Sequence, residues 1–174
     1  QKNATFIEIG SSDGSEMERA LIYAKGDINA YLLEPSPENL KIAKHRIQKS
    51  KYVESVSFSN LAISAKNGPI TFFYKPGNSN LSGVREPSGE SMKRSVESVT
   101  LSKFLRSKNI DPDSHLVIKM DIEGEEAKVL KSSIETLKKY KSVSILMEVH
   151  PGEYEGDEMH LALQSLFDTG FSTS

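Results

Sequence analysis

The fold class of this 174-residue chain is indicated most clearly by one stretch, Phe6-Ile-Glu-Ile-Gly-Ser-Ser-Asp-Gly14. Residues that favour β-structure run from Thr5 to Ile9 and stop at Gly10, and apolar residues at helical spacing follow from Ser15 to Ala24. The order strand, tight turn, helix is therefore expected. Glycine permits a positive φ and a close approach of the backbone, and the start of the helix offers free N–H groups to a carboxylate or phosphate.

Strands and helices alternate along the rest of the chain. Further strands are predicted at residues 30–33, 53–61, 70–74, 96–100, 115–120 and 143–147. Helices are predicted at residues 36–47, 101–108, 125–140 and 158–168, the first with Ser36 as its N-cap. This alternation predicts an α/β fold with a mostly parallel sheet and helices on both faces. In such sheets ligands bind at the carboxyl ends of the strands.

Two segments in the middle of the chain give predictions of their own. The turn sequence Asn67-Gly68 predicts that residues 70–74 pair with residues 53–61 as a hairpin. Residues 75–95 are rich in Gly, Pro, Ser and Asn and hold few apolar positions. We expect this second segment to form a surface loop or mobile lid that carries substrate contacts.

Composition narrows the classes of function. The chain has 22 Lys and Arg against 24 Asp and Glu, so it lacks the broad basic field that nucleic acid would need. It has no cysteine, which excludes disulfides, thiolate metal sites and cysteine nucleophiles. No apolar run approaches the roughly 18 residues of a membrane span. We expect a single cytoplasmic domain over residues 1–174 that acts on a small molecule, with residues missing at both ends.

The turn after the first strand favours one kind of cofactor over another. A dinucleotide site wants G-x-G-x-x-G, but Ser12 and Ser15 occupy the second and third glycine positions and would crowd a pyrophosphate. The amino-acid tail of S-adenosylmethionine has an ammonium and a carboxylate, which suit an acidic strand end at Glu8 and a helix N-terminus. Such a turn can also be purely structural.

Acidic residues follow three other predicted strands. Glu34 lies 24 residues after Gly10, close to the spacing of about 20 at which an acidic residue binds ribose hydroxyls. Asp121, Glu148 and His150 end the two later strands, and Glu148 and His150, two residues apart on a strand, would share one face. A histidine or carboxylate there can act as a base.

Structural alternatives exist for the same side chains. Glu123 and Glu125 could cap the following helix, Glu148 could pair with Lys119, and Glu34 or His150 could be a solvated loop residue. Asp121, Glu148 and His150 could instead bind Mg²⁺ or Mn²⁺. Their spacing is no diagnostic metal motif, so we predict no metal.

Five segments of the chain together resemble the FkbM-type methyltransferases, in matching order and rough spacing. They are residues 6–14, residues 31–40, Asn60-Leu-Ala-Ile-Ser, Lys119-Met-Asp-Ile-Glu-Gly-Glu-Glu-Ala-Lys-Val-Leu130 and Leu146-Met-Glu-Val-His150. The element after Lys119 is the most specific of them. In two places the chain departs from the family pattern: Glu8 stands where the family usually has Asp, and Ser11-Ser12-Asp13 replaces a more usual Ala-Asn pattern.

The resemblance implies a Rossmann-like class I methyltransferase fold, S-adenosylmethionine as methyl donor, and mostly O-methylation of hydroxyls on sugars, glycolipids or polyketides. Combined with the strand-end argument, it predicts catalytic roles for Asp121, His150 and Glu148. The predicted cofactor-binding residues are Glu8, Gly10, Ser11, Asp13, Gly14, Glu34, Pro35, Asn60, Ala62 and Asp121. The rival hypotheses are a nicotinamide-dependent oxidoreductase, disfavoured by the missing glycines, and a non-catalytic cofactor-binding module.

Overall fold

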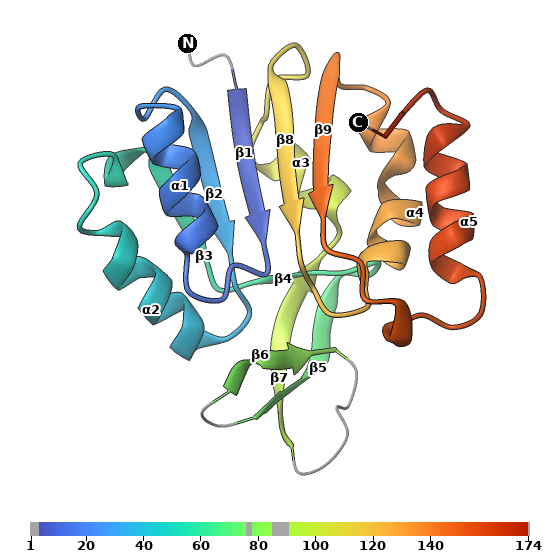
Figure 1. Ribbon diagram of the computed structural model, residues 1–174, viewed down its shortest axis with the longest axis horizontal. Coiled ribbons are helices and arrows are strands. Elements are labelled where there is room, and N and C mark those ends of the chain that lie inside the picture. Colours follow the sequence, from blue (N-terminus) through green and yellow to red (C-terminus); the bar gives the residue numbers. More distant parts are fainter. Residues whose placement is uncertain (1–3, 76–77, 85–90, 174) are drawn as a thin grey trace.

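The computed structural model describes residues 4–75, 78–84 and 91–173 and places two sheets one below the other (Figure 1). All strands of the larger sheet are parallel, in the order β3-β2-β1-β8-β9. These strands are β1 (Ala4–Ile9), β2 (Asn29–Leu33), β3 (Val56–Ser59), β8 (His115–Met120) and β9 (Ser142–Met147). The predicted parallel α/β sheet is therefore confirmed.

Helices cover both faces of this sheet. On one face lie α1 (Ser15–Tyr23) and α2 (Pro37–Ile47), and on the other α3 (Leu101–Ser107) and α4 (Glu126–Leu137). The last helix, α5 (Glu158–Phe167), packs against α4. Short 3₁₀ turns, η1 (Val53–Ser55) and η2 (Pro151–Glu153), precede β3 and follow β9.

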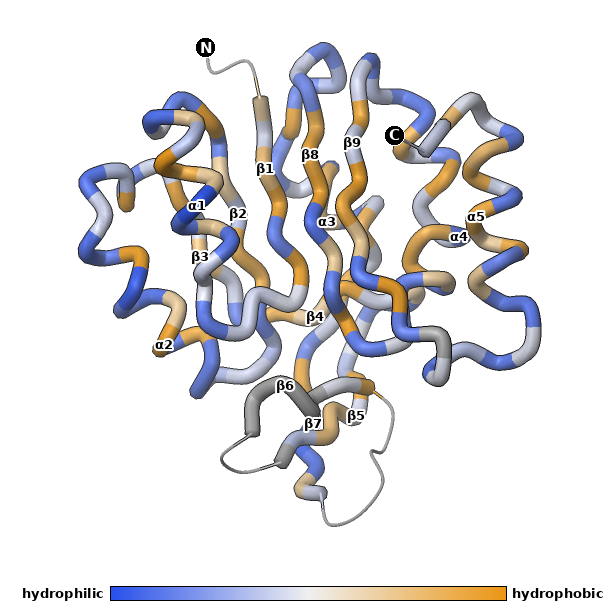
Figure 2. Tube along the Cα trace, viewed as in Figure 1, coloured by the Kyte–Doolittle hydropathy of each residue, from blue (hydrophilic) through white to orange (hydrophobic). Residues whose placement is uncertain are grey.

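The strands alternate between two hydrophobic cores. Ile7 and Ile9 of β1 are buried with α3 and α4, whereas Phe6 packs towards the core under α1 and α2. Burying a side chain of this size is worth about 1.5–3 kcal/mol. Figure 2 shows hydrophobic stretches along β1, β8 and β9 and an alternation of hydrophobic and hydrophilic residues along the helices. In the described part of the chain, no helix has the length and apolar character needed to cross a membrane.

The second α-helix begins as its sequence predicts. Ser36 Oγ accepts a hydrogen bond from Asn39 N–H at 3.2 Å, and Pro37 occupies the first turn. The N-cap satisfies one of the free N–H groups at the helix start, and proline loses nothing there. The start of α2 is thereby fixed directly after the end of β2, where Glu34 lies.

The smaller sheet corrects the predicted hairpin. Its order is β4-β7-β5-β6, formed by β4 (Ala62–Ile63), β7 (Met92–Val99), β5 (Gly68–Lys75) and β6 (Asn78–Gly83). Residues 70–74 pair antiparallel with β7 and not with residues 53–61. The latter form η1 and β3, and β3 joins β2 in the larger sheet, where Val56 and Phe58 pack under α1 and α2.

The predicted loop over residues 75–95 is wrong where the structure describes it. Residues 78–83 form β6, and β7 begins at Met92. Residues 76–77 and 85–90 of the predicted lid lie outside the described residues. Main-chain pairing with β5, from Gly68 opposite Ser98 to Tyr74 opposite Met92, builds this sheet, so few apolar side chains are needed.

Candidate active site

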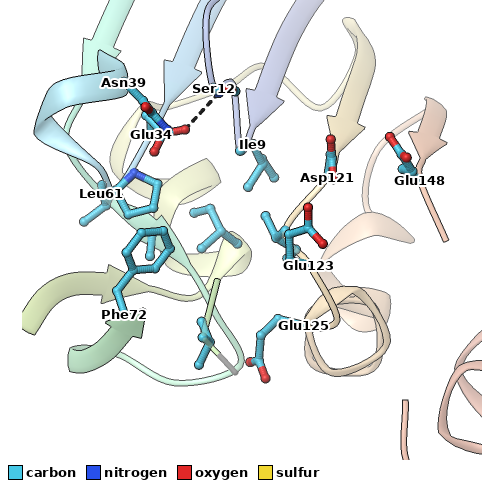
Figure 3. A pocket seen from close by; sticks show the side chains of 16 residues that line it. Ile9, Ser12, Glu34, Asn39, Leu61, Phe72, Asp121, Glu123, Glu125 and Glu148 are labelled. Atoms are coloured by element: carbon cyan, nitrogen blue, oxygen red, sulfur yellow. Dashed lines mark hydrogen bonds between the residues drawn. The ribbon is translucent and has the colours of Figure 1, made fainter. Parts of the chain in front are cut away.

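A cavity of about 400 Å³ lies at the carboxyl edge of the parallel sheet, lined on the other side by Ala62, Ile63 and Phe72 of the smaller sheet. Figure 3 shows Glu34 and Asn39 on one side of it, above Leu61 and Phe72, with Asp121, Glu123 and Glu148 on the other. Among the predicted site residues, those that line the cavity are Gly10, Glu34, Pro35, Ala62, Asp121 and Glu148. The other predicted site residues do not line it: Glu8, Ser11, Asp13, Gly14, Asn60 and His150.

The turn after β1 holds the cavity floor in place. Gly10 has a φ of 76°, and a Cβ there would lie 1.8 Å from the Asp121 carbonyl oxygen. Its N–H donates to the Leu33 carbonyl at 3.1 Å, and Asp121 N–H donates to the Ile9 carbonyl at the same distance. The absence of a side chain at Gly10 therefore lets the ends of β1, β2 and β8 come together.

Gly14 and Asp13 fasten this turn to the helices instead of lining the cavity. A Cβ on Gly14 would lie 3.0 Å from Ala43 in α2. Asp13 accepts hydrogen bonds from Ser15 N–H at 3.0 Å and Arg46 Nη2 at 2.6 Å. Burial by itself would raise the pKa of Asp13. The Ser15 hydrogen bonds and the Arg46 charge outweigh burial, so this pKa is lowered.

Glu34 is buried at the end of β2, with 3% exposure. Its Oε2 accepts from Ser12 N–H at 2.9 Å and its Oε1 from Ser36 N–H at 2.8 Å. Burial raises the pKa of Glu34 to about 7 against the effect of these two N–H groups. Asn60 donates to the carbonyls of Glu34 and Pro35 at 2.9 Å, so it orients this strand end.

Glu8 has a different environment. It is fully buried, and neither of its carboxylate oxygens has a hydrogen-bond partner among the described residues; the same holds for Ser11 Oγ. Burial raises the pKa of Glu8 to about 7, opposed by the Lys119 ammonium and by weaker contacts with Ser11 and the Met17 N–H. An underpartnered buried carboxylate costs stability. Neither Glu8 nor Ser11 lines the cavity, so a ligand reaches these oxygens only if the turn after β1 shifts.

Asp121 and His150, two of the predicted catalytic residues, are in contact. Asp121 Oδ1 lies 3.2 Å from His150 Nε2, and Asp121 Oδ2 lies 3.4 Å from Lys119 Nζ. His150 Nδ1 lies 3.7 Å from Glu123 Oε2. Burial disfavours the imidazolium, but the Asp121 hydrogen bond and the nearby carboxylates outweigh burial, so the pKa of His150 is raised.

Glu148 departs from the prediction in its position. Strand β9 ends at Met147, so Glu148 and His150 lie in the connection after it and do not share a strand face. The structural alternative for Glu148, an ion pair with Lys119, is not found among the described residues either, because Lys119 pairs with Asp121. The Glu148 main-chain N–H donates to the Met120 carbonyl at 3.0 Å, which keeps its side chain at the cavity wall.

The structure also changes the candidate cation ligands. Within the described residues, Asp121, Glu123 and His150 each offer one ligand atom, and these atoms lie within 4.8 Å of one another. Glu123 therefore takes the place that the sequence alternative gave to Glu148. Burial and neighbouring carboxylates raise the pKa of Glu123. Two carboxylates and an imidazole are a donor set that divalent cations accept, although carboxylate–imidazole clusters also occur without a metal.

The most important residue missed by sequence reasoning is Glu126. It is fully buried at the first position of α4, and its carboxylate accepts from Ile122 N–H and Gly124 N–H, each at 2.9 Å. Glu123 and Glu125 were the expected capping residues, yet Glu125 makes no capping hydrogen bond and pairs with Lys128 at 2.6 Å. Because three glutamates lie within four positions, the sequence does not indicate which of them has its side chain buried.

Comparison with known proteins agrees with this geometry. The model of the methyltransferase FkbM domain matches residues 8–172. A structure of precorrin-6y C5,15-methyltransferase from Geobacter metallireducens GS-15 is similar with a TM-score of 0.52 at 14% identity, over 98% of this chain and 63% of that one. That likeness shows the Rossmann-like class I methyltransferase fold; no curated protein matches the chain. Since the family match covers nearly its whole length, the chain belongs to the FkbM methyltransferase family.

Proposed function

We propose that this protein is an S-adenosylmethionine-dependent methyltransferase that methylates a hydroxyl group of a small molecule such as a sugar, a glycolipid or a polyketide. The observation that carries the proposal is the cavity itself. It extends from Glu34, at the end of β2, to Asp121, whose carboxylate contacts the His150 ring outside the cavity lining. The family match supports methyl transfer as the chemistry.

The described residues fit S-adenosylmethionine. Glu8 and Ser11 hold buried oxygens without partners at the first turn, where the ammonium of the cofactor's amino-acid tail would be accepted. Glu34 has lone pairs left beyond its two N–H contacts, which suit the two ribose hydroxyls. Leu61 and Phe72 form an apolar wall suited to the adenine ring.

The reaction asks the protein mainly for alignment and for removal of one proton. S-Adenosylmethionine supplies a methyl group on a sulfonium, which the acceptor oxygen displaces in line as the C–S bond breaks. The hydroxyl proton goes to the pair formed by Asp121 and His150. Lys119 and His150 hold the two oxygens of Asp121, so the pair is in place before an acceptor arrives.

A methyl-transfer assay tests the proposal. Methyl-labelled S-adenosylmethionine would be incubated with separate panels of sugars, glycolipids, polyketides and, for contrast, amines. We expect label on a hydroxyl-bearing acceptor, with the rate lowered at least about 100-fold in Asp121→Asn and unchanged in the surface variant Asp168→Asn. Label on amines alone would contradict O-methylation. Cofactor binding without transfer to any panel would indicate a non-catalytic binding module.

A further inference from the structure

We propose that Glu126 and Tyr154 are positioning residues, which together hold Asp121, Glu123 and His150 in the arrangement that methyl transfer requires. The inference rests on the proposed function for its catalytic meaning. The contacts themselves are a property of the structure and can be tested separately.

Glu126 fixes the connection that follows β8. Its Oε1 accepts from Ile122 N–H and its Oε2 from Gly124 N–H, both at 2.9 Å. These two amides flank Glu123, and Ile122 directly follows Asp121. A buried carboxylate that accepts several main-chain N–H groups makes strong, directional hydrogen bonds. Movement of this connection would therefore break bonds that no water replaces.

Tyr154 extends the same link to the connection that follows β9. Its hydroxyl donates to Glu126 Oε2 at 2.9 Å and accepts from His150 N–H at 3.3 Å. Glu126 and Tyr154 are 28 positions apart and come from different strand-to-helix connections. One carboxylate and one hydroxyl thus join the backbone of His150 to the backbone on both sides of Glu123.

The connection after β8 needs such support because its backbone is unfavourable. Glu123 has a φ of 53° and Gly124 a φ of 97°. A residue with a side chain costs about 1–2 kcal/mol in the left-handed region, so Glu123 would leave it if the neighbouring amides were released. From the other side, a Cβ on Gly83 of β6 would lie 3.0 Å from Glu123 Cβ, so Glu123 has little space to move.

The carboxylate of Glu126 is held in place by hydrogen bonds, and its charge also interacts with His150 without forming an ion pair. Within the described residues no Lys, Arg or His forms an ion pair with it, whereas Glu125 next to it pairs with Lys128. A cation would neutralise the Glu126 carboxylate without fixing its orientation. Hydrogen bonds from main-chain N–H groups and a phenol hydroxyl do fix this orientation, as a positioning role requires.

The tyrosine hydroxyl can be removed without removing the ring. Tyr154 packs against the core between α4 and α5, with Ala127 and Met159 among the buried residues of that cluster. Tyr154→Phe keeps the ring and deletes the hydrogen bonds of the hydroxyl, those with Glu126 and His150 among them. Tyr140→Phe is the matched control, because Tyr140 is also half-buried, just after the other end of α4, and its hydroxyl donates to the Ile110 carbonyl, its one hydrogen-bond partner among residues 4–75, 78–84 and 91–173.

The experiment compares both variants with the wild-type protein in three measurements: kcat with a confirmed acceptor, the Kd of S-adenosylhomocysteine, and amide hydrogen exchange. We expect Tyr154→Phe to lower kcat by about 10-fold, since small misplacements of reacting groups cost that much or more. The Kd should change by less than about 2-fold, because Glu126 and Tyr154 lie away from the Glu8 and Glu34 side. Exchange at Ile122, Gly124 and His150 should accelerate, while Tyr140→Phe leaves all three measurements unchanged.

Other outcomes separate this inference from the proposed function. If the wild-type protein methylates no acceptor, the proposed function fails, and exchange at the three amides together with the NMR signal of the His150 ring still tests the link. Unchanged exchange and an unchanged ring signal in Tyr154→Phe would overturn the inference. So would a kcat loss that Tyr140→Phe shares, or one matched by an equal loss of cofactor affinity. Glu126→Gln, with Glu135→Gln as its control, should follow Tyr154→Phe with a larger effect.

Discussion

At the scale of single residues, two buried glutamates distinguish the side of the site where we propose that the cofactor binds. Glu8 and Glu34 lie at the ends of neighbouring strands, and burial raises the pKa of each to about 7. Glu34 uses its oxygens on two main-chain N–H groups, whereas those of Glu8 have no described partner. Under the proposed function they have different tasks: Glu34 would shape the turn and bind the ribose, and Glu8 would bind the ammonium of the cofactor.

The state of Glu8 predicts how cofactor binding depends on pH. Below its pKa of about 7 the carboxyl is protonated, and it must lose that proton to bind an ammonium. We expect the Kd of S-adenosylmethionine to be about 10-fold higher at pH 6 than at pH 8, because Glu8 is ionised in only about a tenth of the protein molecules at pH 6. In Glu8→Gln the Kd should change less with pH, and the remaining change should come from Glu34, whose pKa is also about 7. Calorimetric titration across this range measures it, and an identical slope in both proteins would argue against the role of Glu8.

The second residue-scale prediction concerns His150. Its raised pKa keeps the ring protonated to a higher pH than usual, and only the neutral ring accepts a proton. If His150 receives the acceptor's proton, kcat should rise with pH through that raised pKa. His150→Ala should lower kcat by about 100- to 10,000-fold while cofactor binding survives. Near-normal turnover in the alanine variant would transfer the role of base to Asp121 alone.

On the scale of elements, the sequence predicted most strands and helices because their apolar residues recur at clear periods. Residues 70–74 and most of residues 96–100 were predicted as strands and form parts of β5 and β7, but their pairing into a smaller sheet was missed for a physical reason. Strand β7 is largely exposed and polar, and its place is set by main-chain pairing with β5. Arg94 of β7 contacts Tyr74 at 4.1 Å and donates to Glu38 of α2, so this sheet is also held by contacts distant in sequence. Neither kind of contact has a periodic signature.

The same distinction applies to the site. Strand-end positions are readable from the chain, so the cavity residues Gly10, Glu34 and Asp121 were predicted. The link between Glu126 and Tyr154 depends on how two connections fold against each other. Nothing in the local pattern distinguishes Glu126 from Glu123 or Glu125, since all three are acidic residues at one helix start.

The close approach of the ends of β1, β2 and β8 at Gly10 leads to a prediction about stability. Gly10→Ala would place a Cβ against the Asp121 carbonyl and would also disfavour a φ of 76°. Gly68→Ala is the matched control, because Gly68 has a positive φ of 108° but a Cβ there would meet no atom of the described residues within 4 Å. We expect Gly10→Ala to lose more than about 4 kcal/mol of unfolding free energy and Gly68→Ala about 1–3 kcal/mol. Urea denaturation measures both, and equal losses would show that close packing at Gly10 is unimportant.

At the scale of the whole molecule, the parallel sheet brings its polar residues to one edge and the smaller sheet closes the space beside it. In the proposed function, the side of the cavity at Glu34 binds the adenosine part of the cofactor, and Asp121, which contacts His150, lies on the side where the proton is removed. Ser12 separates the two cofactor classes, because its side chain stands where a pyrophosphate-binding turn needs glycine. The central claim is therefore that this cavity selects S-adenosylmethionine.

Calorimetric titration of the protein with S-adenosylmethionine and, separately, with NADH tests that claim most directly. The structure predicts one site for S-adenosylmethionine and none for NADH, with binding weakened about 10- to 150-fold in Glu34→Ala, in line with about 1.5–3 kcal/mol for hydrogen bonds to a charged group. Circular dichroism of the variant would establish that it is folded. Binding of NADH, or an unchanged affinity for S-adenosylmethionine in the folded Glu34→Ala protein, would contradict the account.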